Sequence, residues 1–600
     1  MPFVSVKYTE TSIYESLNIK KLLGKLRKRV GFPVSFWGLL IFILSLFFIL
    51  IYFNLFTLWR VIMKMFKKST MSLALTAAMI GGVAVTQQAS ANLDVDGGLT
   101  AADPFVSNNA LGQALVYPYY TVRGGKKSII NIFNTSNKTI VAKVRFHESH
   151  NSRDVLDFNL ILSPFDKWSG TLENGASGAL FKSRDNTCTV PRIPSTGVAL
   201  NNVAYTGANQ DQDLSDTGSD RTREGYVEVI AMGQADAGDA GGAVGPHTAL
   251  NVGNVAYLAE HVAGMPRDAT CNIIKSRFEA GSGATAPTVI GGTLAGNVQM
   301  NVAAAGGSGN PAAAPEFTAI TTGFNPLRGA LTIVDDTNGV GFGISALAIA
   351  DWTDPAAPDL NIAALATTAT MLTSQTYPYF LEPTLASRDG LWTTTGLPVV
   401  EAAIAATTVI NEWSNNPVNG AATDWVIQFP TKGFHVDIPY SPGTTTGCFD
   451  GNVQAAVNLF RGNAPANSVP NVPACTAGVA PFTNRFTAVG SAVTISAKTV
   501  DKEEASAVSS GVSFSPAQPT ASTSIPWESN VVTFGGNSVL SSDSPELILD
   551  PVGSIGSGET NGQAFVTFAA GALPVIGFVA KERDQGGTSN YGQIMTHSFK

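Results

Sequence analysis

Apolar and polar residues alternate along several stretches of this chain, beginning soon after residue 114. In TIVAKVRF, every second residue from Ile140 to Phe146 is apolar, and Lys143 and Arg145 occupy the opposite face. VLDFNLIL follows the same period from Leu156 to Leu162. Because successive side chains of a strand point to opposite sides, this period predicts strands with one face in a core.

Turn signals separate these stretches, as expected for antiparallel strands. NTSNK, residues 134–138, predicts a turn, and Asn338-Gly339 predicts a hairpin between two apolar runs. QAFVTFAAGALPVIGFVAKE predicts a closing hairpin that turns at Gly571. TDWVIQFPTKGFHVDI predicts a strand interrupted at Pro430.

One segment after residue 92 has a helical period. VVEAAIAATTVINEW, Val399–Trp413, places apolar residues three and four apart and predicts a helix. We therefore expect a mainly β protein of antiparallel, sandwich-like regions with few helices, preceded by an N-terminal membrane or leader segment.

Two hydrophobic runs open the chain. The first, residues 34–59, is rich in Phe, Leu and Ile and long enough to span a bilayer as a transmembrane helix. Six basic residues precede it, so its N-terminus would face the cytoplasm.

The second run resembles a secretory signal peptide over residues 63–91. Lys64, Lys67 and Lys68 precede a short apolar stretch, and Ala89 and Ala91 supply the small residues that signal peptidase accepts. The two predictions conflict. If residues 34–59 span the membrane with the N-terminus in the cytoplasm, residues 63–91 begin on the outer side and cannot act as an export signal. We expect residues 1–62 to be an upstream extension and the mature chain to start at Asn92. The alternative keeps residues 34–59 as a membrane anchor.

A Gly/Ala-rich tract, residues 281–315, divides the remainder. Such a composition predicts a linker or insertion. It separates a first β-sandwich-like domain, residues 92–280, from a second β-rich domain, residues 316–600.

Composition fits an exported β protein. Only 14% of residues are charged and 59 are Gly, which indicates many turns and a weakly charged surface. Residues 1–91 hold 11 Lys/Arg and 2 Asp/Glu, which leaves 26 basic and 43 acidic residues and a net charge of −17 beyond them. An acidic body repels phosphate backbones, so we expect no nucleic-acid partner.

Four cysteines, all beyond the leader, point to two disulfides in an oxidising compartment. Four residues permit three pairings. Proximity along the chain favours Cys188–Cys271 and Cys448–Cys475.

Two clusters could hold a metal ion. His147, Glu148 and His150 lie within FHESH, but on a strand the two histidines point to opposite faces, so a polar strand end is expected there. The second cluster is an acidic loop whose carboxylates could gather calcium, although it lacks the EF-hand pattern. Its residues are Asp211, Asp213, Asp216 and Asp220. We expect no other cofactor.

No motif for nucleophilic catalysis or phosphate binding is present, since GxSxG, Walker A and GxGxxG are missing. We expect a protein without enzymatic activity and name no catalytic residue. Aromatic residues could stack on sugar rings if they were exposed, or fill a sandwich core. They are Tyr117, Tyr119, Tyr120, Trp168, Trp352, Trp392 and Trp425.

Residues 128–172 resemble the immunoglobulin-like modules of bacterial surface proteins, in which an I-x-N-x-S/T strand leads into a V-x-V-x-F strand. The whole chain is similar to uncharacterised exported proteins of Gram-negative bacteria, a resemblance that implies no activity. We expect a structural or adhesive role at the cell surface, with an extracellular or periplasmic location.

Alternative functions are a secreted carbohydrate-binding protein or carbohydrate-active enzyme, and an outer-membrane protein. Expected partners are cell-surface components or other copies of the chain. We expect membrane contact only through the N-terminal segment.

Overall fold

The chain divides into two units, Met1–Ala84 and Val85–Lys600. The computed structural model describes residues of the second unit only: 104–206, 216–235, 255–278, 288–289, 292–293, 320, 323–352, 385, 397–416, 418–437, 477–502, 522–535, 538–543, 545–549, 560–584 and 590–600. The leader, the run 34–59 and the cleavage residues Ala89 and Ala91 lie outside them. Across these ranges, no helix is long and apolar enough to cross a membrane.

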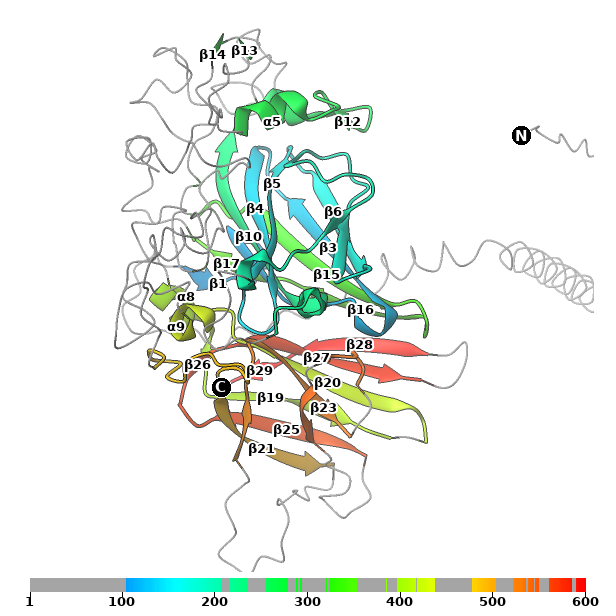
Figure 1. Cartoon of the computed structure of the whole chain (residues 1–600), viewed down its shortest axis with the longest axis vertical. Helices are drawn as coiled ribbons and strands as arrows, with labels where there is room; N and C mark the ends of the chain where they lie inside the picture. The colour runs from blue at the N-terminus through cyan, green and yellow to red at the C-terminus, as the bar shows by residue number, and fades with distance from the viewer. Residues whose placement is uncertain are drawn as a thin grey trace, which may run out of the picture. The chain divides into compact units, whose positions relative to one another are not determined.

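The described residues are mainly β, as the alternation predicts, and most of their strands belong to four sheets (Figure 1). We call the first two sheets, built from residues 105–350, the first sheet pair. The other two, built from residues 408–599, are the second sheet pair. Neighbouring strands run antiparallel in these described sheets, except that β23 and β24 run parallel.

The first sheet pair contains sheets one and two. Sheet one has the order β1 (Phe105–Val106), β17 (Leu347–Ala350), β2 (Ala114–Thr121), β10 (Glu224–Ala235), β4 (Thr139–Glu148), β5 (Asp154–Leu162), β8 (Thr189–Val190). Sheet two has the order β16 (Val340–Ser345), β15 (Leu327–Asp335), β3 (Lys126–Asn134), β6 (Lys167–Asn174), β7 (Ala179–Lys182), β9 (Val198–Ala199).

The second sheet pair contains sheets three and four. Sheet three has the order β22 (Ser522–Ile525), β21 (Val493–Asp501), β25 (Asn561–Phe568), β19 (Thr408–Ser414), β29 (Ser598–Phe599). Sheet four has the order β24 (Pro545–Leu549), β23 (Ser529–Phe534), β20 (Ala421–Gln428), β27 (Ile576–Arg583), β28 (Tyr591–Thr596).

Short elements connect and cover the sheets. The helices are α4 (Val255–Ala259), α5 (Asn272–Phe278), α8 (Leu397–Ile404), α9 (Gly433–Val436), η1 (Arg123–Gly125), η2 (Val203–Tyr205) and η4 (Ser219–Arg223). Two-residue strands pair as β11 (His261–Val262) with β12 (Met265–Pro266), β13 (Thr288–Val289) with β14 (Gly292–Thr293), and β18 (Ala405–Ala406) with β26 (Leu573–Pro574).

The core of the first sheet pair confirms the predicted faces of β4 and β5. Phe146 of β4 and Phe158 of β5 pack with Phe181, and the ring centroids of Phe146 and Phe181 lie 5.0 Å apart. Val141, on the opposite face of β4, packs instead with α4 and α5. Side chains of α8 cover the outer face of sheet one around β17 and β2.

Sheet four is covered on both faces. Val426 of β20 and Phe578 of β27 belong to the core of the first sheet pair, whereas Trp425 and Ile427 pack against sheet three. In β28, a Cβ added at Gly592 would lie 2.5 Å from Val340 of β16. The apolar core of the first sheet pair therefore extends onto one face of sheet four.

The strands β15, β16 and β17 lie beyond the boundary that the Gly/Ala-rich tract predicted, yet they pair within the first sheet pair. β15 pairs with β3, and β17 pairs with β1 and β2. Residues 327–350 thus belong with the first region rather than the second. A Gly/Ala-rich composition shows where the alternation of apolar and polar residues stops. It does not show which sheet the next strand joins, because that depends on the strand's pairing partners. The Asn338-Gly339 hairpin between β15 and β16 is confirmed, and Gly339 has the positive φ of 67° that such a turn needs.

The predicted helix over Val399–Trp413 is wrong in its second half. Helix α8 ends at Ile404, and β19 begins at Thr408. The run Thr407–Ile410 is β-branched, which favours a strand. β19 also pairs with β25 and β29, so its backbone gains partners on both sides.

The predicted closing hairpin at Gly571 is also wrong, because the two strands lie in different sheets. β25 pairs with β19 and β21, whereas β27 pairs with β20 and β28. The alternating QAFVTF suits sheet three, where one face is open, and the continuous apolar VIGFVA suits sheet four, where both faces are covered. Similarly, β20 ends at Gln428, and helix α9 rather than a strand follows Pro430.

Candidate functional site

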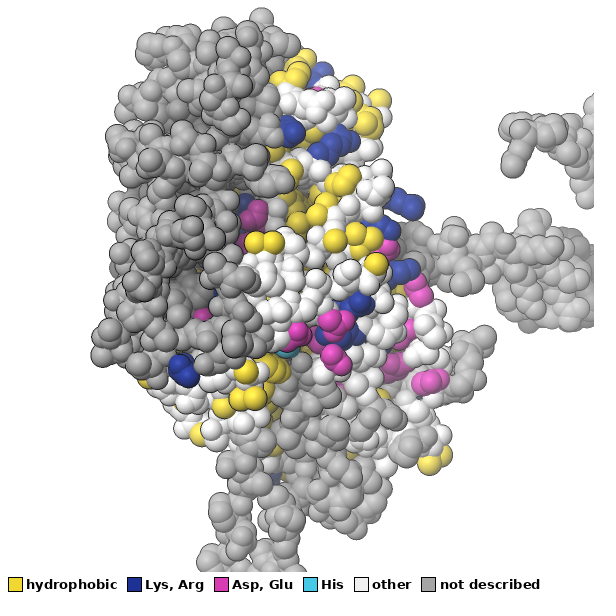
Figure 2. All heavy atoms as spheres, viewed as in Figure 1, with side chains coloured by type: hydrophobic (Ala, Val, Ile, Leu, Met, Phe, Trp, Pro, Cys, Tyr) yellow, Lys and Arg dark blue, Asp and Glu magenta, His cyan; other side chains and the backbone are white. Residues whose placement is uncertain are grey.

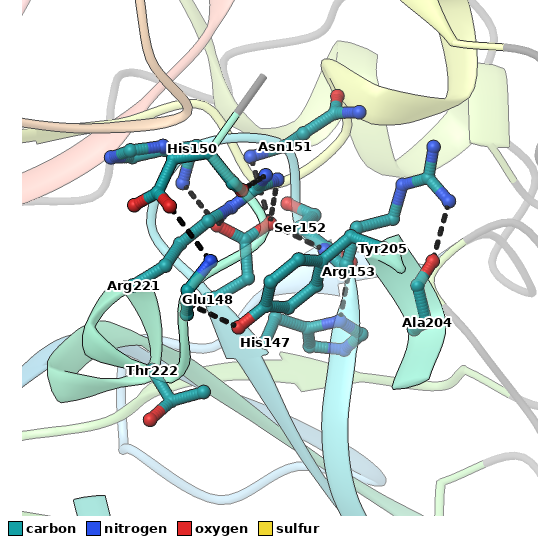
Figure 3. A network of polar contacts seen from close by, with 12 residues as sticks. His147, Glu148, His150, Asn151, Ser152, Arg153, Ala204, Tyr205, Arg221 and Thr222 are labelled. Atoms are coloured by element: carbon teal, nitrogen blue, oxygen red, sulfur yellow. Dashed lines mark hydrogen bonds and ion pairs between the residues drawn. The ribbon is translucent and has the colours of Figure 1, made fainter. Parts of the chain in front are cut away.

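A turn between β4 and β5 carries the densest group of buried polar side chains (Figure 3). Glu148 ends β4, and its carboxylate accepts hydrogen bonds from the backbone N–H groups of His150 (2.7 Å), Asn151 (3.0 Å) and Arg153 (2.9 Å). Ser152 takes a positive φ of 53° inside the turn. The Glu148 carboxylate therefore holds the turn in shape by accepting hydrogen bonds from three of its backbone N–H groups.

Arg221 of η4 completes the coordination of Glu148. Its Nε lies 2.6 Å and its Nη2 2.9 Å from the two carboxylate oxygens, and both side chains are fully buried. The guanidinium also lies over the Tyr205 ring, 4.4 Å from its centroid. A bidentate, fully desolvated pair of this kind is rigid because each oxygen has a directed donor.

The same turn reaches the second sheet pair. Asn151 and Arg153 both donate to the carboxylate of Asp437, which follows α9. Arg153 also donates from Nη1 to the carbonyl oxygen of Ala204 at 2.8 Å. Asp437 is completely buried, so these donors replace its water.

Residues Trp527–Ser529 close the turn from the other side. The N–H of Ser529 donates to the carbonyl of Ser149 at 2.8 Å, and the Trp527 ring stacks on His150 with centroids 3.9 Å apart. The turn therefore packs against the second sheet pair through a backbone hydrogen bond and a ring stack as well as through ion pairs.

Glu528 is the unusual member of this cluster. It is fully buried, and neither carboxylate oxygen accepts a hydrogen bond from the described residues. Burial raises the pKa of Glu528 well above its usual range; the charge of Lys432 opposes the rise, while Glu148 and other nearby carboxylates add to it. A protonated Glu528 reduces the number of buried negative charges that the cations must balance.

His147 lies beside the turn and serves it structurally. Its Nδ1 donates to the Ser152 carbonyl at 2.8 Å, its ring stacks on Tyr226, and its Nε2 lies 3.5 Å from Glu228. Among the described residues, no group of three or more His, Cys, Asp or Glu is placed to hold a metal ion. His147 and Glu148 end β4 and His150 lies in the turn that follows, so FHESH is a polar strand end joined to a turn.

These side chains are closed to solvent and face one another. Such a network suits joining two sheet pairs, because Glu148 and Asp437 have their hydrogen-bond donors within the protein and their buried carboxylates are not accessible to a diffusing substrate. Its members come from segments centred near residues 150, 220, 435 and 528. We call it the junction network.

The predicted disulfide between Cys188 and Cys271 is confirmed, with Cα atoms 5.6 Å apart. It joins β8 to the start of α5. Cys448 and Cys475 lie outside the described residues, so their pairing stays a prediction.

The acidic loop is described only in part. Asp211 and Asp213 lie outside the described residues. Asp220 pairs with Arg123 (2.8 Å) and Arg223 (2.5 Å). Burial by itself raises the pKa of Asp220, but the two guanidinium groups outweigh it and lower the pKa below its usual value. Asp216 accepts a hydrogen bond from the N–H of Gly218 at 2.7 Å. The calcium hypothesis stays a prediction.

The aromatic residues considered for sugar stacking form the interior instead. Six of the seven are at most 1% exposed: Tyr117, Tyr119, Tyr120, Trp168, Trp352 and Trp425. Trp392 lies outside the described residues. Their faces pack against protein, so none of these six rings offers a stacking platform.

Sequence reasoning missed Arg153, Arg221, Asp437 and Glu528. Charged residues next to apolar runs were the available signal, as in TDWVIQFPTKGFHVDI and SIPWESNVVTF. That signal does not identify which charges meet, because the partners are far apart along the chain, 73 residues for Glu148 and Arg221 and 284 for Arg153 and Asp437. No family model, no curated protein and no solved structure matches the chain.

Proposed function

We propose that the chain is an exported bacterial cell-surface protein with a structural or adhesive role, built from two β-sandwiches that act as one rigid body. The leader at residues 63–91 would direct export, with cleavage after Ala91. The mature protein would lie at the cell surface, outside the cell or in the periplasm.

The junction network is the observation that carries this proposal. A protein that bears load or presents a binding surface needs its parts held at fixed positions. Here a turn of the first sheet pair is inserted against the second through the Arg153–Asp437 ion pair and the Trp527–His150 stack. Sheet four packs on one face with the core of the first sheet pair and on the other face with sheet three.

The disulfide supports export. A Cys188–Cys271 bond persists in oxidising compartments and is rare in the cytosol of most bacteria. It fixes a loop segment at the edge of sheet one, where a surface protein meets shear and proteases.

Localisation of the full chain in a Gram-negative host tests the proposal. We expect a mature N-terminus at Asn92 by mass spectrometry, an oxidised Cys188–Cys271 pair, and digestion by protease added to intact cells or to the periplasmic fraction. A chain that keeps peptides from residues 30–60 and remains reduced in the cytoplasm would refute export.

Attachment assays test the role. Beads coated with the mature protein should adhere to cells or to one another more than beads coated with an unrelated acidic protein. Equal attachment of both kinds of bead would contradict the adhesive role. A deletion strain whose cell envelope is unaltered would contradict the structural role.

A further inference from the structure

A pocket of about 320 Å³ lies beside the Cys188–Cys271 disulfide. Its wall is formed mostly by residues 183–195, the segment that runs from β7 through β8, together with Trp168 of β6. This volume is at the lower end of the range, about 300–1,000 Å³, that small-molecule pockets occupy. A ligand of one or two sugar rings fits that size.

The wall is held in place before any ligand arrives. Asn186 donates from its amide to the carbonyl of Gly264 at 3.0 Å, and Arg192 donates to the carbonyl of Ala269 at 3.3 Å. The Cys188–Cys271 bond ties the same two segments together. A fixed wall lowers the ordering cost of binding.

Two exposed arginines give the pocket its charge. Arg184 has no ion-pair partner or hydrogen bond among the described residues. Arg192 donates one N–H, to the carbonyl oxygen of Ala269. The remaining guanidinium donors suit a carboxylate or a phosphate. Asp185 also lines the pocket, and its carboxylate accepts hydrogen bonds from the N–H groups of Ser169 (3.2 Å) and Thr187 (3.0 Å). Its charge offsets one of the two guanidinium groups, so the lining keeps a net positive charge.

This positive charge stands out against the rest of the protein, which has a net charge of −17 after residue 91. On the face shown in Figure 2, basic side chains gather over the part of the first sheet pair near α5 and β12, while acidic side chains are concentrated toward the second sheet pair. An anionic ligand would be repelled by most of the surface and attracted here.

Neutral polar groups complete the lining. The side chain of Ser195 is exposed, and its hydroxyl has no partner within the described ranges. A free hydroxyl can both donate to and accept from the hydroxyl groups of a sugar.

We propose that this pocket binds an anionic sugar unit, one that carries a carboxylate or a phosphate, of a surface polysaccharide. The inference rests on the proposed adhesive role and deepens it by naming the ligand class. Arg184 and Arg192 would hold the anion, and the hydroxyl and amide groups of the wall would contact the sugar ring.

Calorimetric titration of the purified, oxidised mature protein tests the proposal. The probes are glucuronate, glucose 6-phosphate, glucose and inorganic phosphate. We expect at least one acidic sugar to bind at least ten-fold more tightly than glucose and than inorganic phosphate. Arg184→Gln and Arg192→Gln should each weaken binding by about ten-fold, because each removes charge-assisted hydrogen bonds.

Lys498→Gln is the matched control, since it removes one exposed positive charge from β21 of sheet three. It should leave binding within two-fold. A preference for glucuronate identifies a carboxylated sugar, and a preference for glucose 6-phosphate identifies a phosphorylated one; either result supports the proposal. Unchanged melting temperatures of the arginine variants separate lost contacts from misfolding.

The proposal would be overturned if neither glucuronate nor glucose 6-phosphate bound, or if glucose bound as tightly as these two sugars. It would also be overturned if inorganic phosphate bound as tightly as glucose 6-phosphate while glucuronate did not bind. An equal loss in Lys498→Gln would overturn it too, since binding would then follow overall charge. Titration of purified protein is independent of cell location, so failure here leaves the export proposal intact, and failure of export leaves the pocket result intact.

Discussion

Arg153 and Asp437 form a buried ion pair between the two sheet pairs, although 284 residues separate them along the chain. The Arg153 side chain is 2% exposed and that of Asp437 is 0% exposed. Because both charges have lost their water, each depends on the other, and Asp437 also accepts from the amide of Asn151 while Arg153 donates to the Ala204 carbonyl.

Replacing Arg153 with Met should destabilise the protein strongly. The variant keeps an unbranched apolar stem but removes the guanidinium group and leaves Asp437 with an uncompensated buried charge, so we expect a loss of about 3–5 kcal/mol in the free energy of unfolding. Urea denaturation followed by tryptophan fluorescence measures it.

Lys127→Met serves as the control for that variant. Lys127 pairs with Asp336 in the same fold, but their side chains are 42% and 55% exposed. Its loss should stay below about 1 kcal/mol. Equal losses of unfolding free energy in the two variants would contradict the claim that the buried Arg153–Asp437 pair stabilises the protein more than an exposed pair does.

His597 should resist protonation. Its Nε2 lies 3.0 Å from the Val426 carbonyl, which only accepts, and its Nδ1 lies 3.2 Å from the Asn411 amide nitrogen, which only donates. The ring therefore fits as a neutral imidazole with its proton on Nε2. Burial lowers the pKa of His597 to about 4, and the Val426 contact partly opposes this effect.

The lowered pKa of His597 fixes the sign of a pH effect. Below pH 6.5 the unfolded chain takes up a proton that the folded chain excludes, so stability falls as pH drops toward 4, by about 3 kcal/mol in total. His597→Gln should remove this contribution, and NMR titration should find the imidazole neutral at pH 5.5. An imidazole that titrates near 6.5 would contradict it.

Asp424 should produce the opposite trend. Its buried carboxyl accepts hydrogen bonds from Ser538 Oγ (2.7 Å) and the Leu540 N–H (2.8 Å). Burial raises its pKa to about 6, and these hydrogen bonds limit the rise. Between about pH 4 and 6 the folded chain holds a proton that the unfolded chain has lost. Stability therefore falls as pH rises through this window, by about 3 kcal/mol in total.

Asp424→Asn should cancel that fall. The amide oxygen still accepts from Leu540, and the side chain carries no charge at any pH. The free energy of unfolding of the variant, relative to the natural protein, should therefore be higher at pH 8 than at pH 4.5. Parallel stability curves for the two proteins would show that Asp424 ionises normally.

Removing the Cys188–Cys271 bond should cost stability. The cysteines are 83 residues apart in sequence, and in the loop-entropy model closing such a loop stabilises the folded state by about 4 kcal/mol. Thermal melts of Cys188→Ser/Cys271→Ser against the oxidised protein measure this. Non-reducing peptide mapping of the natural chain should recover this pair and also Cys448–Cys475. Four alkylatable thiols in the native protein would contradict both pairings.

The sequence predicted those features that depend on neighbouring residues. The period of two in TIVAKVRF placed Phe146 in the core and Lys143 away from it, and Asn338-Gly339 marked a true hairpin. Both signals are local, since side-chain direction and turn geometry are set within a few residues. The Cys188–Cys271 pairing also followed from closeness along the chain.

Features that depend on distant partners were missed or misplaced. The pattern in QAFVTFAAGALPVIGFVAKE predicted two strands correctly but joined them in one hairpin. The helical period predicted a helix through Trp413, whereas residues from Thr408 onward form β19, which pairs with β25 and β29. The junction network had no local signature, because Glu148, Arg221, Asp437 and Glu528 become meaningful only when brought together.

By itself, therefore, the sequence determined that this is a mainly β chain with alternating faces and defined turns, and it favoured the Cys188–Cys271 pairing. The tertiary structure alone decided that sheet four is buried on both faces and that Arg153 meets Asp437. The physical reason is that periodicity records whether a side chain is buried, whereas the identity of the residues that bury it depends on segments hundreds of positions away.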